Sequence, residues 1–594
     1  MVKYTPMIEQ YLQIKKNHQD CLLLFRLGDF YEMFFSDAEI AARELEIVLT
    51  ARDGGGRKVP MCGVPYHAVN SYIARLLARG YSVAICDQVE DPKQAKGIVK
   101  REVTRIITPG TVLGDLIGDE DQNNYLAAVV LWKDRIGFAY IDVSTGEFNV
   151  TECDEEDHLW IESELQRVHP AECLIVHELY PSSLWQDNAS QADIQFMTLE
   201  LERYNPAQAA DFIKRQYELL TLEGIGLGEH QAAVIAVGAI LAYLEETQKT
   251  RLIHIQLPRY YSDQQSMRMD TFTRRNLELV STLREDRRDG SLLGILDFCL
   301  TAMGRRMLRK WIEEPLIDEQ EINKRLDAVE QLHASSVLRK QLRELLAEVY
   351  DLERLAGKLG SGIANPRDLL ALQQSLQIIP ALKDTLSDIQ AEESQLLYDI
   401  ADIDDLAPVT ELIAHAIDEE APITVREGGI IKAGFHEEID ALREIQQQGN
   451  QWLISFEARE KERTGMKFLK VGYNKVFGYY LEVSKSNLDL VPPEYIRKQT
   501  LVNTERFITE ELKEYEDKLL RARENLHDLE YQCFQDVKEQ LLDWIPAMLD
   551  TAQTLAQLDV LASLAEAAFL YDYTRPSFNQ QGEIKISGGR HPVV

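Results

Sequence analysis

The chain has 594 residues, with 64 Lys and Arg against 98 Asp and Glu, and its formal net charge is −34. This acidity argues against a protein that coats nucleic acid or anionic membranes nonspecifically, because such binding needs a broad positive surface. The hydrophobic fraction of 45% excludes a disordered chain, and at about 150 residues per domain the length predicts about four domains.

Residues 1–112 alternate helix-like and strand-like stretches, which predicts a mixed α/β domain. Within them, residues 93–105 carry five basic residues and one acidic residue. Such a basic island is either a solvated surface or a face that meets phosphate. Turn formers and acids in residues 113–123 predict a linker.

Residues 124–254 begin with three strands in hairpin order and continue with a helix, a strand and a final helix. This pattern predicts a second α/β domain. Residues 113–250 hold seven Lys and Arg against 26 Asp and Glu, so we expect this part of the chain to avoid phosphate.

Residues 262–434 show apolar side chains at helical spacing, with breaks at Pro315, Gly360 and Pro366. This pattern predicts a helical core that leads into a first lever helix. Residues 531–570 predict a helix that returns to the core.

Two very long helical patterns occupy about 436–465 and about 503–545, and they belong mainly to a lever region at residues 435–530. Aromatic and β-branched residues between them, at about 467–500, predict a strand pair. The second basic island, residues 461–506 with nine basic and five acidic residues, coincides with this pair. The sequence therefore predicts a multidomain fold: two α/β domains, then an all-helical core with long antiparallel lever helices and a small β clamp at their tip.

Known catalytic and metal-binding patterns are missing from the 594 residues. The sequence contains no G-x-x-x-x-G-K-[ST] loop for phosphates, no H-E-x-x-H and no G-x-S-x-G. Seven scattered cysteines without C-x-x-C spacing favour buried thiols over zinc or disulfides. We therefore expect no enzyme, no catalytic residue, no bound cofactor and no metal in this chain.

The apolar runs of the sequence predict no membrane-spanning segment. Its longest nearly continuous apolar run, residues 232–244, is shorter than the roughly 20 residues that a membrane span needs. The N-terminus has no apolar signal core. We expect a cytoplasmic protein without a membrane partner.

The segment GDFYEMF, residues 28–34, sets three aromatic side chains around one carboxylate. It can be a core strand, in which Phe30 and Phe34 are buried and Glu32 is exposed. Alternatively it is an aromatic wedge, because a Phe ring inserted at a base step unstacks and kinks a duplex. The cost is smallest where pairing is already faulty, so such a wedge would select damaged or mispaired DNA.

Several long motifs resemble the MutS family of bacterial DNA mismatch repair proteins, and the resemblance covers essentially the whole chain. They are GDFYEMF (28–34), PMCGVPYHA (60–68), VAICDQVEDP (83–92), RIITPGT (105–111), MRMDTFTRRNLEL (267–279), GSLLGILDFCLTAMGRRMLRKWI (290–312), KVGYNKVFGYYLEVSKS (470–486) and SGGRHPVV (587–594). The resemblance implies a mismatch-binding domain, a ribonuclease-H-like connector, a helical core with levers, and a clamp, in that order.

The resemblance also implies the residues that bind DNA. The Phe and Glu of the F-x-E motif, here Phe30 and Glu32, meet the mispaired base from the minor groove, where Phe stacks on the base and Glu hydrogen-bonds to it. Less specific contacts to the DNA backbone are implied for Arg52, Arg57, Lys58, Lys93, Lys96, Lys100, Arg101, Arg105, Lys470, Asn474, Lys475, Arg497 and Lys498.

Family members continue into an ATPase domain, of which residues 571–594 resemble only the start. We therefore expect ATP, magnesium and stable homodimers in an intact protein, and a monomer or weak dimer for this chain. The partners implied are double-stranded DNA with mispairs or small loops and a MutL-type repair protein, in the bacterial cytoplasm near the nucleoid.

Two other functions stay open. The connector and levers could form an interaction module that docks MutL-type partners without DNA specificity of its own. The connector's ribonuclease-H-like fold also suggests nuclease activity, for which Asp142 is a lone candidate carboxylate.

Overall fold

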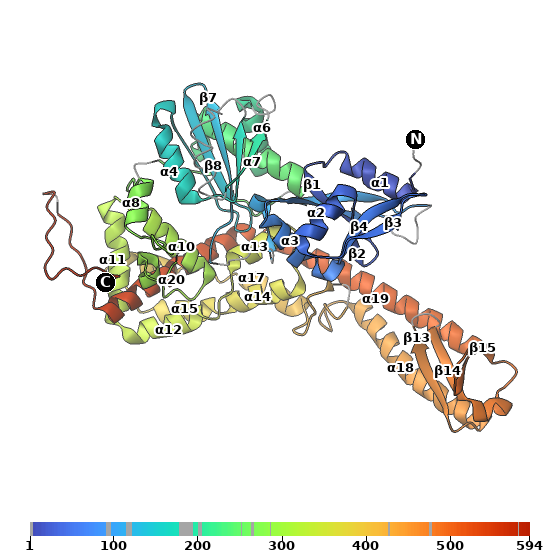
Figure 1. The fold of residues 1–594 in the computed structure, drawn as a ribbon. Coiled ribbons are helices and arrows are strands. Elements are labelled where there is room, and N and C mark those ends of the chain that lie inside the picture. Colours follow the sequence, from blue (N-terminus) through green and yellow to red (C-terminus); the bar gives the residue numbers. More distant parts are fainter. Residues whose placement is uncertain are drawn as a thin grey trace. The chain divides into compact units, whose positions relative to one another are not determined.

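The chain forms two compact units in a computed structural model (Figure 1). The structure describes residues 4–90, 97–114, 121–176, 194–199, 205–250, 252–262, 266–285, 287–425, 428–474, 478–579 and 581–593. Unit 1 comprises residues 1–364, 374–406 and 544–594, and unit 2 comprises residues 365–373 and 407–543.

The first sheet of unit 1 has six strands in the order β3-β4-β2-β1-β5-β6. The pair β1–β5 is parallel and the other pairs are antiparallel. Helices α2 and α3 bury one face, and α1 buries part of the other. The elements are α1 Pro6–Lys15, β1 Cys21–Leu27, β2 Phe30–Phe34, α2 Phe35–Leu45, β3 Thr50–Asp53, β4 Lys58–Pro65, α3 Val69–Leu77, β5 Ser82–Gln88 and β6 Arg101–Ile107.

The second sheet, also in unit 1, has the order β11-β10-β7-β8-β9-β12. As predicted, β7, β8 and β9 form antiparallel hairpins, and a helix and a strand follow. The strand β11 and a division of the final helix into α6 and α7 were not predicted. The elements are β7 Tyr125–Trp132, β8 Arg135–Asp142, β9 Phe148–Asp154, α4 His158–Val168, β10 Glu172–Val176, β11 Gln195–Leu199, α6 Pro206–Tyr217, α7 Gln231–Gln248 and β12 Arg259–Tyr260.

A helical region follows, and its helices break where the sequence predicts. Helix α10 ends just before Pro315, α13 ends at Gly360, and α14 begins at Pro366. The helices are α8 Thr271–Asn276, α9 Leu292–Leu296, α10 Ala302–Glu313, α11 Glu319–Ala334, α12 Ser336–Leu346, α13 Leu352–Gly360, α14 Pro366–Gln377, α15 Ile379–Leu386, α16 Gln395–Ala401 and α20 Ile545–Tyr571.

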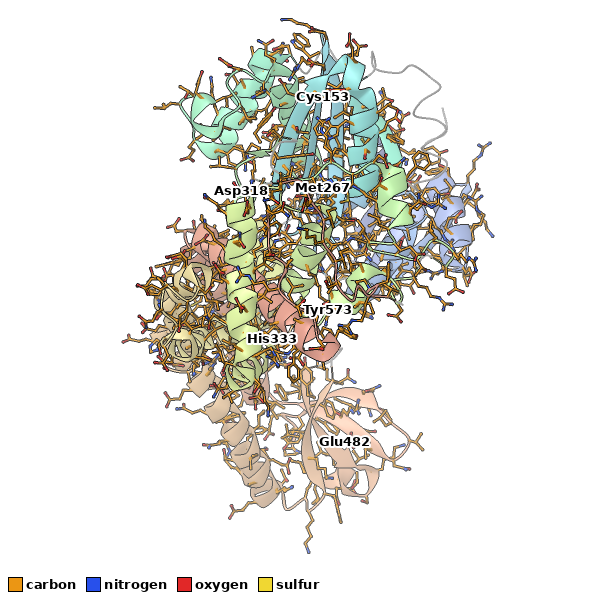
Figure 2. All side chains as sticks on the ribbon, turned by 90° about the vertical axis from the view of Figure 1, so that its left-hand side faces the viewer. Cys153, Met267, Asp318, His333, Glu482 and Tyr573 are labelled. Atoms are coloured by element: carbon orange, nitrogen blue, oxygen red, sulfur yellow. The ribbon has the colours of Figure 1, made fainter. Side chains whose placement is uncertain are left out.

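Helix α20 is the apolar centre of this region. Among the described residues it is the one helix whose length and composition would allow it to cross a membrane. It packs against α10, α11, α12 and α13, and the ring of His333 on α11, labelled in Figure 2, lies 6.4 Å from that of Phe569. Burial among these helices accounts for its apolar composition.

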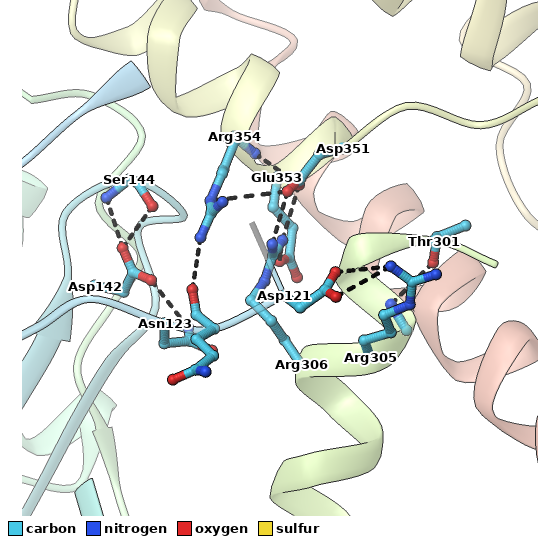
Figure 3. Close-up of polar contacts among 12 residues, drawn as sticks. Asp121, Asn123, Asp142, Ser144, Thr301, Arg305, Arg306, Asp351, Glu353 and Arg354 are labelled. Carbon is cyan, nitrogen blue, oxygen red and sulfur yellow. Dashed lines mark hydrogen bonds and ion pairs between the residues drawn. The ribbon is translucent and has the colours of Figure 1, made fainter. Parts of the chain in front are cut away.

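Ion pairs tie the segment that precedes the second sheet to α10, and α10 to the start of α13 (Figure 3). Arg305 contacts Asp121 at 2.9 Å. The adjacent Arg306, which is buried, contacts Asp351 at 2.7 Å and Glu353 at 2.6 Å. A buried guanidinium needs such partners, because an unpaired buried charge is strongly destabilising.

Unit 2 contains the third sheet, which has four strands in the order β13-β14-β16-β15 and lies between two long helices. Glu482, labelled in Figure 2, is on its strand β14. The elements are α17 Ala407–Ala416, α18 Glu437–Thr464, β13 Leu469–Asn474, β14 Gly478–Ser484, β15 Ile496–Thr500, β16 Thr504–Ile508 and α19 Glu510–Leu542.

Two predictions for this region were wrong. The strand pair is a four-stranded sheet, because Thr504–Ile508 pairs with β14 and β15 instead of starting the long helix. Thr509 caps α19 by accepting a hydrogen bond from the Leu512 amide, so the helix begins at Glu510. Its 33 residues give a length of about 50 Å, and it continues through the expected boundary at residue 530.

Candidate nucleic-acid interface

Phe30 lies at the start of β2, directly after the tight turn that joins β1 to β2. Gly28 makes this turn possible with a φ of +60°, a left-handed conformation that glycine adopts without strain. Phe30 pairs with Leu27 across the hairpin, yet 46% of its surface is exposed. The structure thus contradicts the core-strand interpretation for Phe30.

The alternation of β2 explains why the neighbours of Phe30 are buried. Successive side chains of a strand point to opposite faces, and Tyr31 and Met33 enter the core under α2 and α3. Phe30, Glu32 and Phe34 share the other face, where only Phe34 belongs to the core under α1. Phe30 and Glu32 therefore stand side by side on a strand that is fixed by buried residues on both sides.

Glu32 is held by Arg52 of β3, which reaches it across β4. The Arg52 Nη1 atom lies 2.6 Å from Glu32 Oε2, and the side chains are 43% and 16% exposed, respectively. Gly63 of β4 pairs directly with Glu32, and a Cβ atom there would lie 3.4 Å from Glu32 Cγ. Position 63 therefore lies directly beside the Glu32 side chain.

Other predicted DNA contacts of the first domain fall into two groups. Arg57 and Lys58 are exposed at the turn between β3 and β4, and Lys100 is exposed beside Glu102, 2.7 Å away. These three can meet phosphate. Lys93 and Lys96 lie outside the described residues.

Arg101 and Arg105 point inward and do not join the exposed group. Arg101 is 7% exposed and donates hydrogen bonds to the carbonyls of Arg26 and Val99. Arg105 donates to Gln248 Oε1 at 2.8 Å, and burial lowers the pKa of its guanidinium to about 10. Both side chains satisfy internal acceptors, so the structure gives them a packing role.

In unit 2 the predicted contacts lie on the two edge strands of the third sheet. Lys470 and Asn474 are on β13, at one edge, and Arg497 and Lys498 are on β15, at the other. Lys470, Arg497 and Lys498 are exposed, and Asn474 is half-buried. Lys475 lies outside the described residues.

Carboxylates from both long helices fasten the third sheet, and sequence reasoning missed them. Glu457 of α18 accepts a hydrogen bond from the Val471 amide at 2.9 Å. Glu516 of α19 accepts one from the Tyr479 amide at 3.1 Å, and burial raises its pKa. In a sequence, such acidic residues of a long charged helix look like solvent-exposed residues. Their role becomes visible only when the strands that they contact are known.

Asp142, the candidate nuclease carboxylate, is buried and already satisfied. It accepts hydrogen bonds from the Ser144 amide and hydroxyl and from the Asn123 side chain (Figure 3). Across the part of the chain that the structure describes, no group of three or more His, Cys, Asp or Glu could hold a metal ion. All seven cysteines are free thiols.

Comparisons with known proteins show to which family the chain belongs. Family models described as MutS domain I, MutS domain II and MutS domain III match residues 5–115, 124–256 and 272–565. Proteins named DNA mismatch repair protein MutS are 53% identical in Syntrophomonas wolfei and 48% identical in Symbiobacterium thermophilum. Each match covers 100% of this chain, and 69% and 68% of the respective relative. The chain belongs to the MutS family.

Proposed function

We propose that this chain binds double-stranded DNA at mispaired bases or small loops, as part of DNA mismatch repair. The observation that carries the proposal is the pair Phe30 and Glu32, which lie on one face of an inner strand. Phe30 is exposed there, and Glu32 is half-buried. An aromatic ring beside a carboxyl group offers one group that can stack on a base and one that can hydrogen-bond to it.

Phe30 acts as the wedge in this mechanism. Its ring enters the minor groove, stacks on one base of the mispair and kinks the duplex toward the major groove. Unstacking costs a few kcal/mol for a paired step and less for a mispaired one. That difference in cost favours the mispair over any matched sequence.

Glu32 supplies a hydrogen bond to the base on which Phe30 stacks. An ionised carboxylate can only accept hydrogen bonds, so it must carry a proton when it faces a hydrogen-bond acceptor of the base, such as an unprotonated ring nitrogen. A mispaired base has lost part of its Watson–Crick pairing and offers that edge, whereas a matched base does not.

Most of the affinity in the proposal comes from contacts with the DNA backbone. Exposure, or a position on an edge strand, supports this role for Arg57, Lys58 and Lys100 of unit 1 and for Lys470, Asn474, Arg497 and Lys498 of unit 2. Such contacts position a duplex and carry no sequence information directly. In this proposal α18 and α19 are the levers and the third sheet is the clamp.

Dimers and a MutL-type partner belong to the same proposal. Residues 113–250, with their excess of Asp and Glu, favour a protein partner over phosphate. ATP with magnesium stays an expectation from the family resemblance.

The test is the dissociation constant of the 594-residue chain for a duplex with one G·T mispair and for its matched counterpart, at one stated salt concentration. A clear preference for the mispair is expected. Equal affinity would remove the role of Phe30 and Glu32, and no binding to either duplex would favour the interaction-module alternative.

A further inference from the structure

We propose that Arg52 determines specificity through Glu32: its guanidinium is the counter-ion of the Glu32 carboxylate until a mispaired base takes its place. This inference rests on the proposed function and deepens it. In place of a phosphate-binding role, it gives Arg52 a competition with the mispaired base for the Glu32 carboxylate.

The geometry places the two groups for this exchange. Arg52 pairs with Val59 across β3 and β4, and Val59 is buried under α1. Residues that face each other in an antiparallel pair share a face of the sheet, so Arg52 and Glu32 are on the α1 face together with Phe30. Arg52 thus reaches the carboxylate beside the wedge diagonally across β4, from the level of Val59 to that of Gly63.

Charge explains what the pair does in the absence of a mispair. A carboxylate near the DNA backbone repels phosphate, and an Arg counter-ion within 4 Å cancels most of that repulsion. With a matched duplex, Glu32 has no base to bind and keeps Arg52. The pair therefore lets the protein scan matched DNA without repulsion.

A mispair changes the partner. When Glu32 donates a hydrogen bond to an acceptor nitrogen of the base ring, it takes up a proton from solvent, and a neutral carboxyl group no longer holds the permanently charged guanidinium. Arg52 then moves from Glu32 to solvent or phosphate. Binding to a mispair must therefore offset the free energy that is lost when the Arg52–Glu32 ion pair breaks. Binding to a matched duplex leaves this ion pair intact.

Arg57 offers a matched control on the same connection. It is exposed in the turn between β3 and β4, directly before Lys58, and within the described residues no hydrogen bond or ion pair of its side chain is found. An Arg of this kind can act on DNA only through its own charge. Arg57→Met therefore measures the loss of one cation from this surface.

The experiment measures dissociation constants for the G·T and matched duplexes at one salt concentration. The proteins are the wild-type chain, Arg52→Met, Glu32→Gln, the Arg52→Met/Glu32→Gln double variant and Arg57→Met. Arg57→Met is expected to weaken both duplexes by the same factor. Arg52→Met is expected to weaken binding to the matched duplex about two- to fivefold, the range of a partly exposed ion pair. Binding to the mispaired duplex is expected to be no weaker than in the wild type.

In the Glu32→Gln background, Arg52→Met should weaken binding to both duplexes equally, because no carboxylate at position 32 is left to repel phosphate. The proposal is overturned if Arg52→Met behaves like Arg57→Met, or if its effects are the same with Glu32 and with Gln at that position. The effect of Arg52→Met on affinity for the matched duplex can be compared with and without Glu32 even if the wild type does not prefer the mispaired duplex. Failure of the proposed function is thereby distinguished from failure of the ion pair.

Discussion

The first and third sheets both carry predicted DNA contacts, but they hold them in different ways. In the first sheet, Phe30 and Glu32 lie on β2, an inner strand with neighbours on both sides. In the third sheet, Lys470 and Arg497 lie on the two edge strands. Helices α18 and α19 fasten that sheet through Glu457 and other carboxylates.

The difference matches what each proposed contact needs. A stacking ring and a hydrogen-bonding carboxyl group lose their effect when they move by about 1 Å, so they need a rigid support. A cation near phosphate acts over a Debye length of about 8 Å at physiological salt. Base readout is therefore expected on the inner strand and backbone attraction on the edges, and four variants probe this division.

The largest expected effect is on the stability of unit 2. Glu530 of α19 is fully buried, accepts a hydrogen bond from the Gly429 amide at 2.8 Å and pairs with Arg443 of α18. Removing one partner of a buried ion pair costs about 3–5 kcal/mol. Glu530→Ala should lower hydrogen-exchange protection in α18, α19 and the third sheet by about 100-fold or more.

Its control is Glu514→Ala, because Glu514 lies on the same helix and is exposed. That variant should leave amide protection unchanged. Protection in β1 and β2 should not change in either variant, and a loss there would contradict a separate support for the two sheets.

The next effect is on mismatch preference. Base–aromatic stacking contributes about 1–3 kcal/mol, so Phe30→Ala should reduce the ratio of mispaired to matched affinity by about 10-fold or more. Leu49→Ala is the control, since Leu49 of the same domain is also 46% exposed. Competition binding with the two duplexes measures the ratio, and an unchanged ratio in Phe30→Ala would remove the wedge from the mechanism.

A smaller effect is expected for Arg101, a predicted DNA contact whose side chain is buried in the structure. Arg101 donates to two carbonyls and to Gln10, so Arg101→Met should lower the free energy of unfolding by about 1–2 kcal/mol. Thermal unfolding measures this loss. The salt dependence of DNA binding should stay as in the wild type, and a shallower dependence would restore Arg101 as a phosphate contact.

Much of this division could be predicted from the sequence. Strands, helices and breaks followed from periodicity and from residues such as Pro366, and long motifs pointed to Phe30 and Glu32. A basic residue in a charge run could not be assigned, since Arg101 and Lys100 are adjacent yet one is buried and the other exposed. The start of the strand decides it, because β6 begins at Arg101, whose side chain turns inward to the Arg26 carbonyl, while Lys100 precedes the strand.

The partner of Glu32 could not be predicted from the sequence either. Arg52 is 20 residues away, and only the strand order β3-β4-β2 brings the two together. The strand Thr504–Ile508 was missed because its polar and charged residues also fit a helix. Its pairing with β14 outweighs that local preference.

The smallest effect is expected at an edge of the third sheet. Lys470 is exposed on β13, so Lys470→Gln should weaken mispaired and matched duplexes by the same small factor. If its ammonium neutralises one phosphate, the slope of log affinity against log salt should become shallower by about 1. Lys340→Gln on α12, where Lys340 is 77% exposed, removes the same charge from unit 1 and should keep the wild-type slope. Equal slopes for both variants would mean that net charge alone acts, whereas a changed mismatch ratio in Lys470→Gln would mean that the edge strand takes part in base readout.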